Sequence, residues 1–271
     1  MNPFLRWAGG KKWLIKHIES IIDPNAFNSY HEPFLGGGSV FFRFKFQNQC
    51  FLSDLNEELI NTYIQVRDNV EEVIEHLRIF VNSEEFYYQI RADINEDPVL
   101  RAARFIYLNQ TSFNGIYRVN LKGVYNVPYG YRTKKFLEEQ LLRGASKQLQ
   151  GVQLQFGQFD AEIDNIQQGD LVFLDPPYTI THNNNGFIKY NEKLFSEEDQ
   201  HRLARFIEKI AERGAFYILT NAAHNEIRNI FNMNEPLKLL RASLIGGKNA
   251  TRGNYEEFLF TNIEHGLVEA N

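Results

Sequence analysis

Residues 171–178 read Leu-Val-Phe-Leu-Asp-Pro-Pro-Tyr: four apolar residues followed by a carboxylate, two prolines and an aromatic ring. A short, continuous apolar run of this kind is typical of a strand buried in a parallel sheet. Open α/β sheets bind their ligands just outside the carboxyl ends of their strands. The segment therefore predicts an α/β fold with a reactive site that begins at Asp175.

Residues 175–178 suit one chemical task, the activation of an exocyclic amine on a nucleobase. The lone pair of such an amine is delocalised into the ring, so two acceptors that hold its N–H bonds make the nitrogen more nucleophilic. Asp175 and the carbonyl of Pro176 are candidates for these acceptors, and the ring of Tyr178 offers a face on which an extruded base can stack. The alternative is an ordinary turn, because aspartate and proline are common turn residues.

Apolar runs and turn residues on both sides of this segment extend the α/β pattern. We expect strands at residues 30–34, 51–54, 152–156, 215–220 and 257–261, and helices at 13–22, 40–44, 70–81, 98–109 and 196–213. Helical patterns dominate residues 57–147, with a glycine- and asparagine-rich break at 113–130. The order predicts a doubly wound core, residues 1–56 and 145–271, and a mostly helical insertion, residues 57–144.

A glycine turn follows the first expected strand, in the segment Leu35-Gly36-Gly37-Gly38-Ser39. Glycines there let the backbone approach a nucleotide-like ligand, although a tight loop without a ligand needs similar residues and the G-x-G-x-x-G pattern is not matched. Asp54 ends the next strand, at the position from which such folds hold ribose hydroxyls. Its alternative role is to cap the helix that begins near Asn56.

The composition narrows the class of protein. With 271 residues and 43% hydrophobic content, the chain can form one large domain or a core with an inserted subdomain. Its one cysteine, Cys50, lies in an apolar segment, which favours a buried structural thiol over a nucleophile. Seven scattered histidines give no zinc spacing, so we expect no metal. No long apolar stretch is present, so we expect a soluble intracellular protein without membrane contact.

The charge is distributed unevenly along the chain. The net charge is −5, but residues 101–147 contain nine basic and two acidic residues, so this segment is +7 and the remainder −12. Aromatic residues and amides are interleaved with the basic ones. Such a mixture predicts contact with nucleic acid, and the alternative is a solvated basic face.

Four motifs give the chain a resemblance to the DNA adenine methyltransferases of the Dam type, also called the D12 class or group alpha. They are Phe4-Leu5-Arg6-Trp7-Ala8-Gly9-Gly10-Lys11, Glu32-Pro33-Phe34-Leu35-Gly36-Gly37-Gly38-Ser39-Val40, Asn114-Gly115-Ile116-Tyr117-Arg118-Val119-Asn120 with Asn126-Val127-Pro128-Tyr129-Gly130, and Asp175-Pro176-Pro177-Tyr178. The resemblance implies a Rossmann-like methyltransferase core with an inserted helical target-recognition domain. It also implies S-adenosylmethionine as the methyl donor and adenine in duplex DNA as the acceptor.

The resemblance further implies roles for single residues at the donor and the reacting amine. The catalytic residues would be Asp175, Pro176 and Tyr178, in the roles given above. The donor would be bound by Trp7, Lys11, Phe34, Gly36, Gly38, Asp54, Asp160 and Asp175. Within this set, Asp54 would hold the ribose, and Asp160 would accept from the amine of the donor's adenine.

The residues expected at DNA lie in the insertion and beside the first motif. They are Arg6, Phe113, Asn114, Ile116, Arg118, Pro128 and Arg132. An arginine such as Arg118 can bind guanine through two hydrogen bonds, and Ile116 and Pro128 can contact a thymine methyl group. Members that methylate GATC commonly have Arg-Tyr after the Pro-x-Gly element, where this chain has Tyr131-Arg132. GATC or a related short site is the expected target.

Two alternatives to this function remain open in the sequence. The acceptor could be another amine, such as cytosine N4, an adenine in RNA or a glutamine side chain, or the chain could be a DNA-binding module without activity. The resemblance also implies a cytoplasmic protein of a bacterium, archaeon or phage. It would act alone or beside a separate restriction endonuclease.

Overall fold

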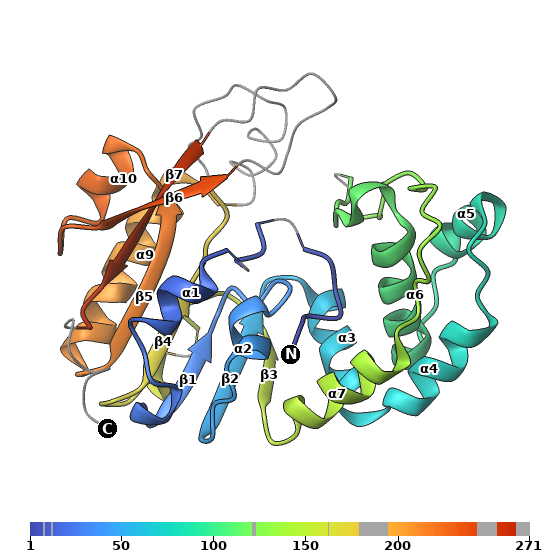
Figure 1. Ribbon diagram of the computed structural model, residues 1–271, viewed down its shortest axis with the longest axis horizontal. Helices are drawn as coiled ribbons and strands as arrows, with labels where there is room; N and C mark the ends of the chain where they lie inside the picture. Colours follow the sequence, from blue (N-terminus) through green and yellow to red (C-terminus); the bar gives the residue numbers. More distant parts are fainter. Residues whose placement is uncertain are drawn as a thin grey trace. The chain divides into compact units, whose positions relative to one another are not determined.

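The computed structural model describes residues 1–7, 9–11, 13–120, 123–161, 163–178, 195–242 and 254–263 (Figure 1). Its strands are β1 (Ser29–Glu32), β2 (Gln49–Asp54), β3 (Gln153–Phe156), β4 (Leu171–Leu174), β5 (Phe216–Ala222), β6 (Leu237–Ala242) and β7 (Asn254–Thr261). They form a seven-stranded sheet in the order β3-β2-β1-β4-β5-β7-β6. The predicted α/β fold is confirmed.

Helices lie between these strands along the chain. They are α1 (Ile15–Glu19), η1 (Pro24–Ala26), α2 (Ser39–Arg43), α3 (Glu57–Asp68), α4 (Val70–Ile79), α5 (Glu84–Ala92), α6 (Pro98–Thr111), η2 (Phe113–Gly115), α7 (Glu139–Leu149), η3 (Ile163–Asn165), α9 (Glu197–Glu212) and α10 (Asn225–Ile230). None of the helices in the ranges given above is long and apolar enough to cross a membrane.

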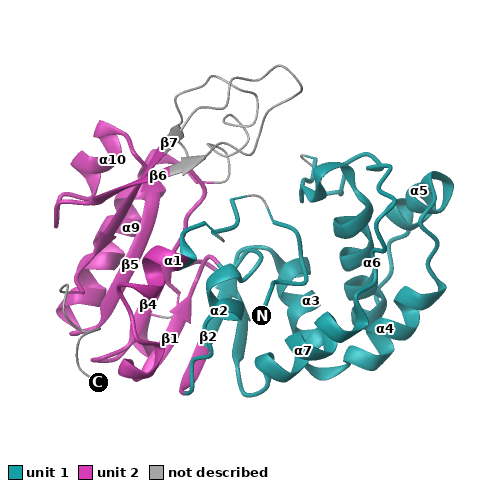
Figure 2. Cartoon of the chain, in the orientation of Figure 1, with its two compact units in different colours: residues 1–15, 35–47, 51–157 teal, residues 16–34, 48–50, 158–271 magenta. Residues whose placement is uncertain are grey.

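The chain divides into two compact units, coloured separately in Figure 2. Unit 1 comprises residues 1–15, 35–47 and 51–157, and unit 2 comprises residues 16–34, 48–50 and 158–271.

Unit 2 carries most of the sheet. β4 pairs in parallel with β1 and β5, and all four of its residues are buried, as its continuous apolar run predicts. β7 runs antiparallel to both β5 and β6. α9 packs against this sheet through residues such as Leu203 and Ile207. It begins at Ser196, whose hydroxyl accepts from the backbone N–H of Asp199 at 3.2 Å, in the predicted capping box.

Unit 1 contains the helices α3 to α7, strand β3 and residues 51–54 of β2, which pair in parallel with β3 (Figure 1). α6 begins at Asp97, whose carboxylate accepts from the N–H groups of Val99 and Leu100 at 2.8 and 3.0 Å. After α6 the chain forms η2, and residues 116–120 then pair antiparallel with residues 123–126, where Asn126 N–H donates to the Arg118 carbonyl at 3.1 Å. We call residues 116–120 and 123–126 the recognition hairpin.

Candidate active site

Asp175 lies directly after β4, in unit 2. The register of β4 with β5 places it beside Thr220, whose hydroxyl donates to Asp175 Oδ1 at 2.8 Å. Pro176 is buried, whereas Asp175 and Tyr178 are partly exposed. The carboxylate is therefore held at the carboxyl end of a buried parallel strand, where the sequence predicts it.

Tyr178 is oriented by a residue of β7. Its hydroxyl donates to Glu257 Oε2 at 2.6 Å, and Glu257 is only 4% exposed. Burial, followed by the charges of Asp175 and Glu257, raises the pKa of Tyr178 well above its usual value. Tyr178 therefore stays a neutral phenol, and its hydrogen bond fixes the direction of the ring.

Phe34 packs in an aromatic cluster of unit 2, and Asp160 is held beside that cluster by an arginine. The ring of Phe34 stacks on that of Phe159, with centroids 5.3 Å apart, and meets Phe195 edge-on at 5.7 Å. Asp160 accepts from Arg202 through both carboxylate oxygens, with Nε 2.6 Å from Oδ2. The Arg202 guanidinium also lies 4.7 Å from the Phe159 ring centroid. Each oxygen of Asp160 keeps a second lone pair, with which it can accept from an amine.

Asp54 and the glycine turn are joined in unit 1. Asp54 Oδ2 accepts from the N–H of Gly36 at 2.9 Å, and its Oδ1 accepts from the N–H of Asn56 at 3.0 Å. Burial raises the pKa of Asp54 to about 6, against the opposing effect of these hydrogen bonds. Asn56 is the residue that caps α3, accepting from Leu59 N–H at 3.1 Å, so the alternative of Asp54 as the helix cap is wrong.

Trp7 lies against the same turn. A Cβ at Gly36, where φ is +49°, would be 2.8 Å from Cδ1 and Nε1 of the Trp7 indole, and one at Gly37 would be 2.9 Å from Trp7 Cβ. No side chain fits at either position. Gly38 also has positive φ, +63°, and Lys11 is buried at 3% exposure. Unit 1 thus brings together Trp7, the glycine turn and Asp54.

Apart from Arg6 and Arg132, the residues expected to probe DNA lie on η2, on the recognition hairpin and, for Pro128, just after it. Phe113 is 54% exposed, and its N–H donates to the Pro128 carbonyl at 2.9 Å. Asn114, with φ of +56°, and Arg118 are exposed, and Ile116 is partly exposed. Arg118 donates from Nε to Asn126 Oδ1 at 2.8 Å and from Nη2 to the Asn126 carbonyl at 3.2 Å. Its guanidinium is thereby oriented before any base is bound.

Arg6 lies against η2, and Arg132 lies near Arg6. A Cβ at Gly115 would fall 2.5 Å from Nε of Arg6, so the guanidinium packs on the glycine. Burial and the nearby charge of Arg132 lower the pKa of Arg6. Arg132 donates to the Gln110 carbonyl at 3.4 Å. The structure therefore places both arginines beside the expected DNA-contacting residues.

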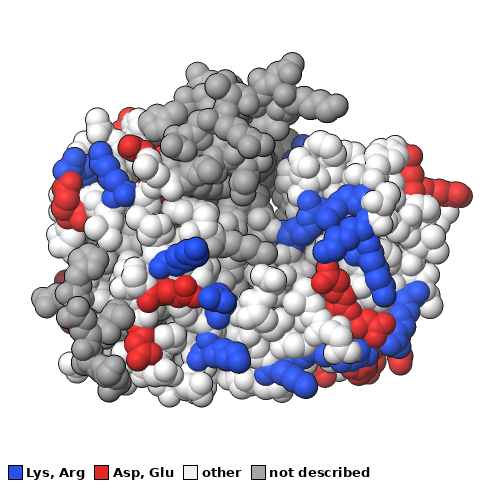
Figure 3. Space-filling view, viewed as in Figure 1, with Lys and Arg blue, Asp and Glu red and all other residues white. Residues whose placement is uncertain are grey.

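Several basic residues of segment 101–147 are occupied by ion pairs. The nitrogen–oxygen distances are 2.5 Å for Arg101–Glu58, 2.7 Å for Arg143–Glu71 and 2.9 Å for Lys134–Glu138. Figure 3 shows basic and acidic side chains side by side on the visible face of unit 1. The count of basic residues thus overstates the charge available for phosphates.

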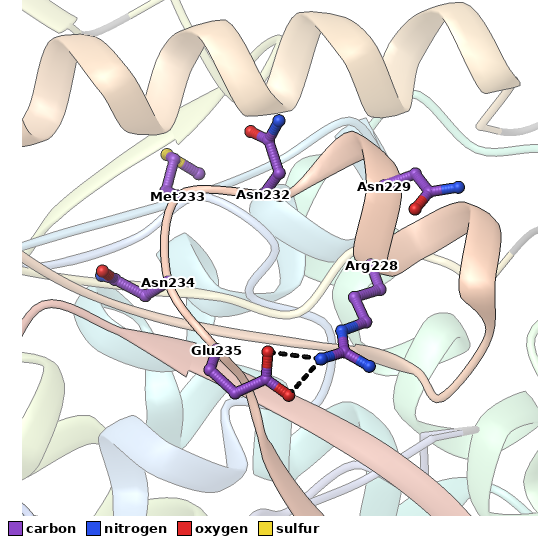
Figure 4. A pocket seen from close by; sticks show the side chains of 6 residues that line it. All are labelled: Arg228, Asn229, Asn232, Met233, Asn234 and Glu235. Carbon is purple, nitrogen blue, oxygen red and sulfur yellow. Dashed lines mark hydrogen bonds and ion pairs between the residues drawn. The ribbon is translucent and has the colours of Figure 1, made fainter.

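A separate hollow lies between α10 and β6. It has a volume of about 560 Å³ and is lined by Arg228, Asn229, Asn232, Met233, Asn234 and Glu235 (Figure 4). Arg228 and Glu235 form an ion pair across it at 2.5 Å. None of the residues expected at the site lines this hollow.

Among the residues that the structure describes, no group of three His, Cys, Asp or Glu side chains could hold a metal ion. Cys50 is 5% exposed, and burial, followed by the charge of Glu32, raises the pKa of its thiol to about 12. The predicted buried structural thiol is confirmed.

Sequence reasoning missed three residues of these arrangements: Thr220, Glu257 and Arg202. Thr220 ends the predicted strand beside β4, and Glu257 is an acid within an apolar strand. These were the available signals for the first two. Arg202 lies in a charged helical segment and carries no comparable signal.

Comparison with known proteins gives matches over nearly the whole chain. Residues 7–242 match the family model described as D12 class N6 adenine-specific DNA methyltransferase. The type II methyltransferase M1.LlaDCHI of Lactococcus lactis subsp. cremoris is 35% identical over 276 residues, covering 97% of this chain and 95% of its own. M.MjaIII of Methanocaldococcus jannaschii is 37% identical, with 82% and 84% covered. The DNA adenine methylase of Escherichia coli K12 is 35% identical, with 81% and 80% covered.

Proposed function

Because the chain belongs to the D12 class N6 adenine-specific DNA methyltransferases, we propose that it transfers a methyl group from S-adenosylmethionine to the N6 amine of adenine in duplex DNA. The observation that carries the proposal is the hydrogen bond from Thr220 to Asp175 at the end of β4, 2.8 Å long. It holds a carboxylate at the sheet edge where α/β folds perform their chemistry.

The target adenine leaves the double helix and stacks on the ring of Tyr178. Asp175 and the Pro176 carbonyl accept hydrogen bonds from the two N–H groups of its amine. These hydrogen bonds localise the lone pair on the nitrogen. S-adenosylmethionine supplies an electrophilic methyl group on a sulfonium. The amine attacks this methyl directly, with no covalent bond to the enzyme. The nitrogen–carbon bond forms as the carbon–sulfur bond breaks, S-adenosylhomocysteine leaves, and the nitrogen then releases one proton to water. Positioning of this kind can supply about 7–11 kcal/mol of the barrier.

The residues of each unit fit the donor. In unit 1 the glycine turn has positive φ at Gly36 and no room for a side chain beside Trp7, so its backbone can lie close to a ligand. Asp54 would accept from the ribose hydroxyls, and Gly38 and Lys11 complete this set. In unit 2 the donor-binding residues of the proposal are Phe34, Asp160 and Asp175.

Recognition of the target sequence is assigned to the hairpin and its neighbours. The residues proposed to contact DNA are Arg6, Phe113, Asn114, Ile116, Arg118, Pro128 and Arg132. We also propose that residues 1–56 and 145–271 form the catalytic core and that residues 57–144 form the inserted target-recognition domain. We propose GATC or a related short site as the target, in a cytoplasmic enzyme that acts alone or beside a restriction endonuclease.

Replacing Arg118 with alanine is expected to relax discrimination at one base pair. A bidentate contact to guanine is worth about 1–3 kcal/mol, so the preference at that position should fall by about tenfold to a hundredfold. Methylation rates on duplexes that differ at each position of the target measure this. Lys134→Ala is the matched control, because Lys134 pairs with Glu138 outside the hairpin. Equal loss on all duplexes would contradict base reading by Arg118.

Glu257 should act as a positioning residue for Tyr178. Glu257→Leu removes the acceptor of the Tyr178 hydroxyl. We therefore expect kcat to fall about tenfold while donor affinity stays within twofold, in keeping with a lost hydrogen bond to a charged group. Glu257→Gln keeps an acceptor oxygen and should restore most of the rate. Equal rates in Glu257→Leu and wild type would contradict this role.

The proposed reaction is tested by incubating the protein with methyl-labelled S-adenosylmethionine and either duplex DNA, RNA or protein. Label is expected in duplex DNA, as N6-methyladenine. Label in RNA or protein alone would contradict duplex DNA as the acceptor. Label in N4-methylcytosine would show that the acceptor is the cytosine amine. Absence of donor binding in calorimetry would support an inactive DNA-binding module instead.

A further inference from the structure

Three rings of unit 1 lie nearly parallel to one another. The Trp7 indole is 5.7 Å from the Tyr117 ring at an interplanar angle of 18°, and 6.4 Å from the Phe105 ring at 22°. Phe105 and Tyr117 are 5.2 Å apart at 28°. Such offset arrangements attract beyond simple burial. We call Trp7, Phe105 and Tyr117 the aromatic stack; it joins the first motif, α6 and the recognition hairpin.

The Trp7 side chain is confined on another side by the glycine turn. The indole Cδ1 and Nε1 lie 2.8 Å from the position that a Cβ of Gly36 would take. The indole therefore contacts the turn assigned to the donor on one side and the rings of Phe105 and Tyr117 on another. A change in one of these contacts must alter how the ring is held against the other.

The backbone that carries Trp7 is fastened to α6. Asn109 Oδ1 accepts from Arg6 N–H at 2.8 Å, and its Nδ2 donates to the Arg6 carbonyl at 2.7 Å. Gln110 Nε2 donates to the Phe4 carbonyl at 2.7 Å. With its backbone fixed in this way, Trp7 has little freedom except in its side chain, and the neighbouring rings set that orientation.

We infer that Tyr117 is a positioning residue for donor binding: its ring, carried by the recognition hairpin, holds the Trp7 indole against the glycine turn. This inference rests on the proposed function, which assigns Trp7 and Gly36 to the donor. We expect bound donor in turn to order the hairpin and raise the affinity for target DNA; by linkage, target DNA then raises the affinity for the donor by the same factor.

The experiment uses Trp13→Phe as the parent, because Trp7 and Trp13 are the two tryptophans of the chain and Trp7 fluorescence then reports alone. Tyr117→Ala in this parent is expected to weaken S-adenosylmethionine binding, without DNA, by about fivefold to tenfold, the change that loss of an aromatic contact produces. The KM for the donor should rise by the same factor, while kcat at saturating donor stays within twofold. The fluorescence of Trp7 should change as well.

Three further variants separate this role from general destabilisation. Tyr117→Phe keeps the ring and should bind the donor within twofold of the parent. Tyr117→Leu keeps apolar volume and should melt near the parent temperature, yet bind as weakly as Tyr117→Ala. Tyr88→Ala removes a tyrosine that is 37% exposed elsewhere in unit 1 and should leave donor affinity unchanged.

The inference would be overturned if Tyr117→Ala and Tyr117→Leu bound the donor as tightly as the parent, or if the donor did not increase the parent's affinity for target DNA. If the parent itself failed to bind S-adenosylmethionine, the proposed function would fail as well. Measuring the parent first distinguishes the two.

Discussion

Asp175→Ala is expected to reduce the rate of methyl transfer by about 10²–10³-fold or more, the loss typical of removing one preorganised polar group from a reacting centre. The side chain accepts from Thr220 at 2.8 Å and so has a fixed direction in which to receive the adenine amine. Donor affinity should remain largely intact, because most of the proposed donor contacts are made elsewhere. Single-turnover rates and donor calorimetry on the same preparation measure both quantities.

Thr220→Val provides the matched control for Asp175. It removes only the hydroxyl that orients the carboxylate, so a smaller loss, of about tenfold, is expected for one lost hydrogen bond to a charged group. Full activity in Asp175→Ala would discard the mechanism. Loss of donor binding in that variant would show that the main role of Asp175 is in binding the donor and not in holding the amine.

Binding of S-adenosylmethionine should weaken about tenfold between pH 7 and pH 5, because Asp54 must be ionised to accept ribose hydroxyls. Burial raises the pKa of this carboxyl to about 6. Hydroxyl donors favour the charged form, so the donor lowers this pKa, and binding near pH 5 releases a proton. Calorimetry in buffers of different ionisation enthalpy measures affinity and proton release together.

The same shift acts in the opposite direction on folding. Without donor, a raised carboxyl pKa favours the fold below about pH 4, and this contribution is lost as the pH rises through the folded pKa. Asp54→Asn should bind the donor about tenfold to a hundredfold more weakly at pH 7, in keeping with a lost hydrogen bond to a charge. Its affinity should not vary between pH 5 and pH 7. An unchanged pH dependence in this variant would exclude Asp54 as the titrating group.

Local patterns predicted much of the fold. The strand at 171–174 is observed as Leu171–Leu174, because a strand buried on both faces is marked at both ends by the change to polar residues. The helix start at Ser196 was predicted for a similarly local reason, its capping box. The helix expected at 13–22 is shorter, Ile15–Glu19, since the chain turns at Ser20 and Ile21.

The elements and contacts that escaped prediction depend on distant partners. β6 has the sequence Leu-Lys-Leu-Leu-Arg-Ala, without strict alternation, and forms by pairing with β7. Thr220 and Asp175 are 45 residues apart, and Glu257 and Tyr178 are 79 apart. Local sequence patterns identify each residue, but they do not show which distant residue it contacts in the fold. The stacking of Tyr117 on Trp7 is hidden for the same reason.

The most direct measurement is sequencing of modified bases in DNA from cells that express this chain, compared with cells that express Asp175→Ala. The wild-type chain should place N6-methyladenine at one short recognition sequence, GATC or a close relative, and the variant should leave that sequence unmodified. Unmodified adenine throughout, or a methyl group found only on cytosine, would contradict the transfer of methyl to an adenine amine held by Asp175.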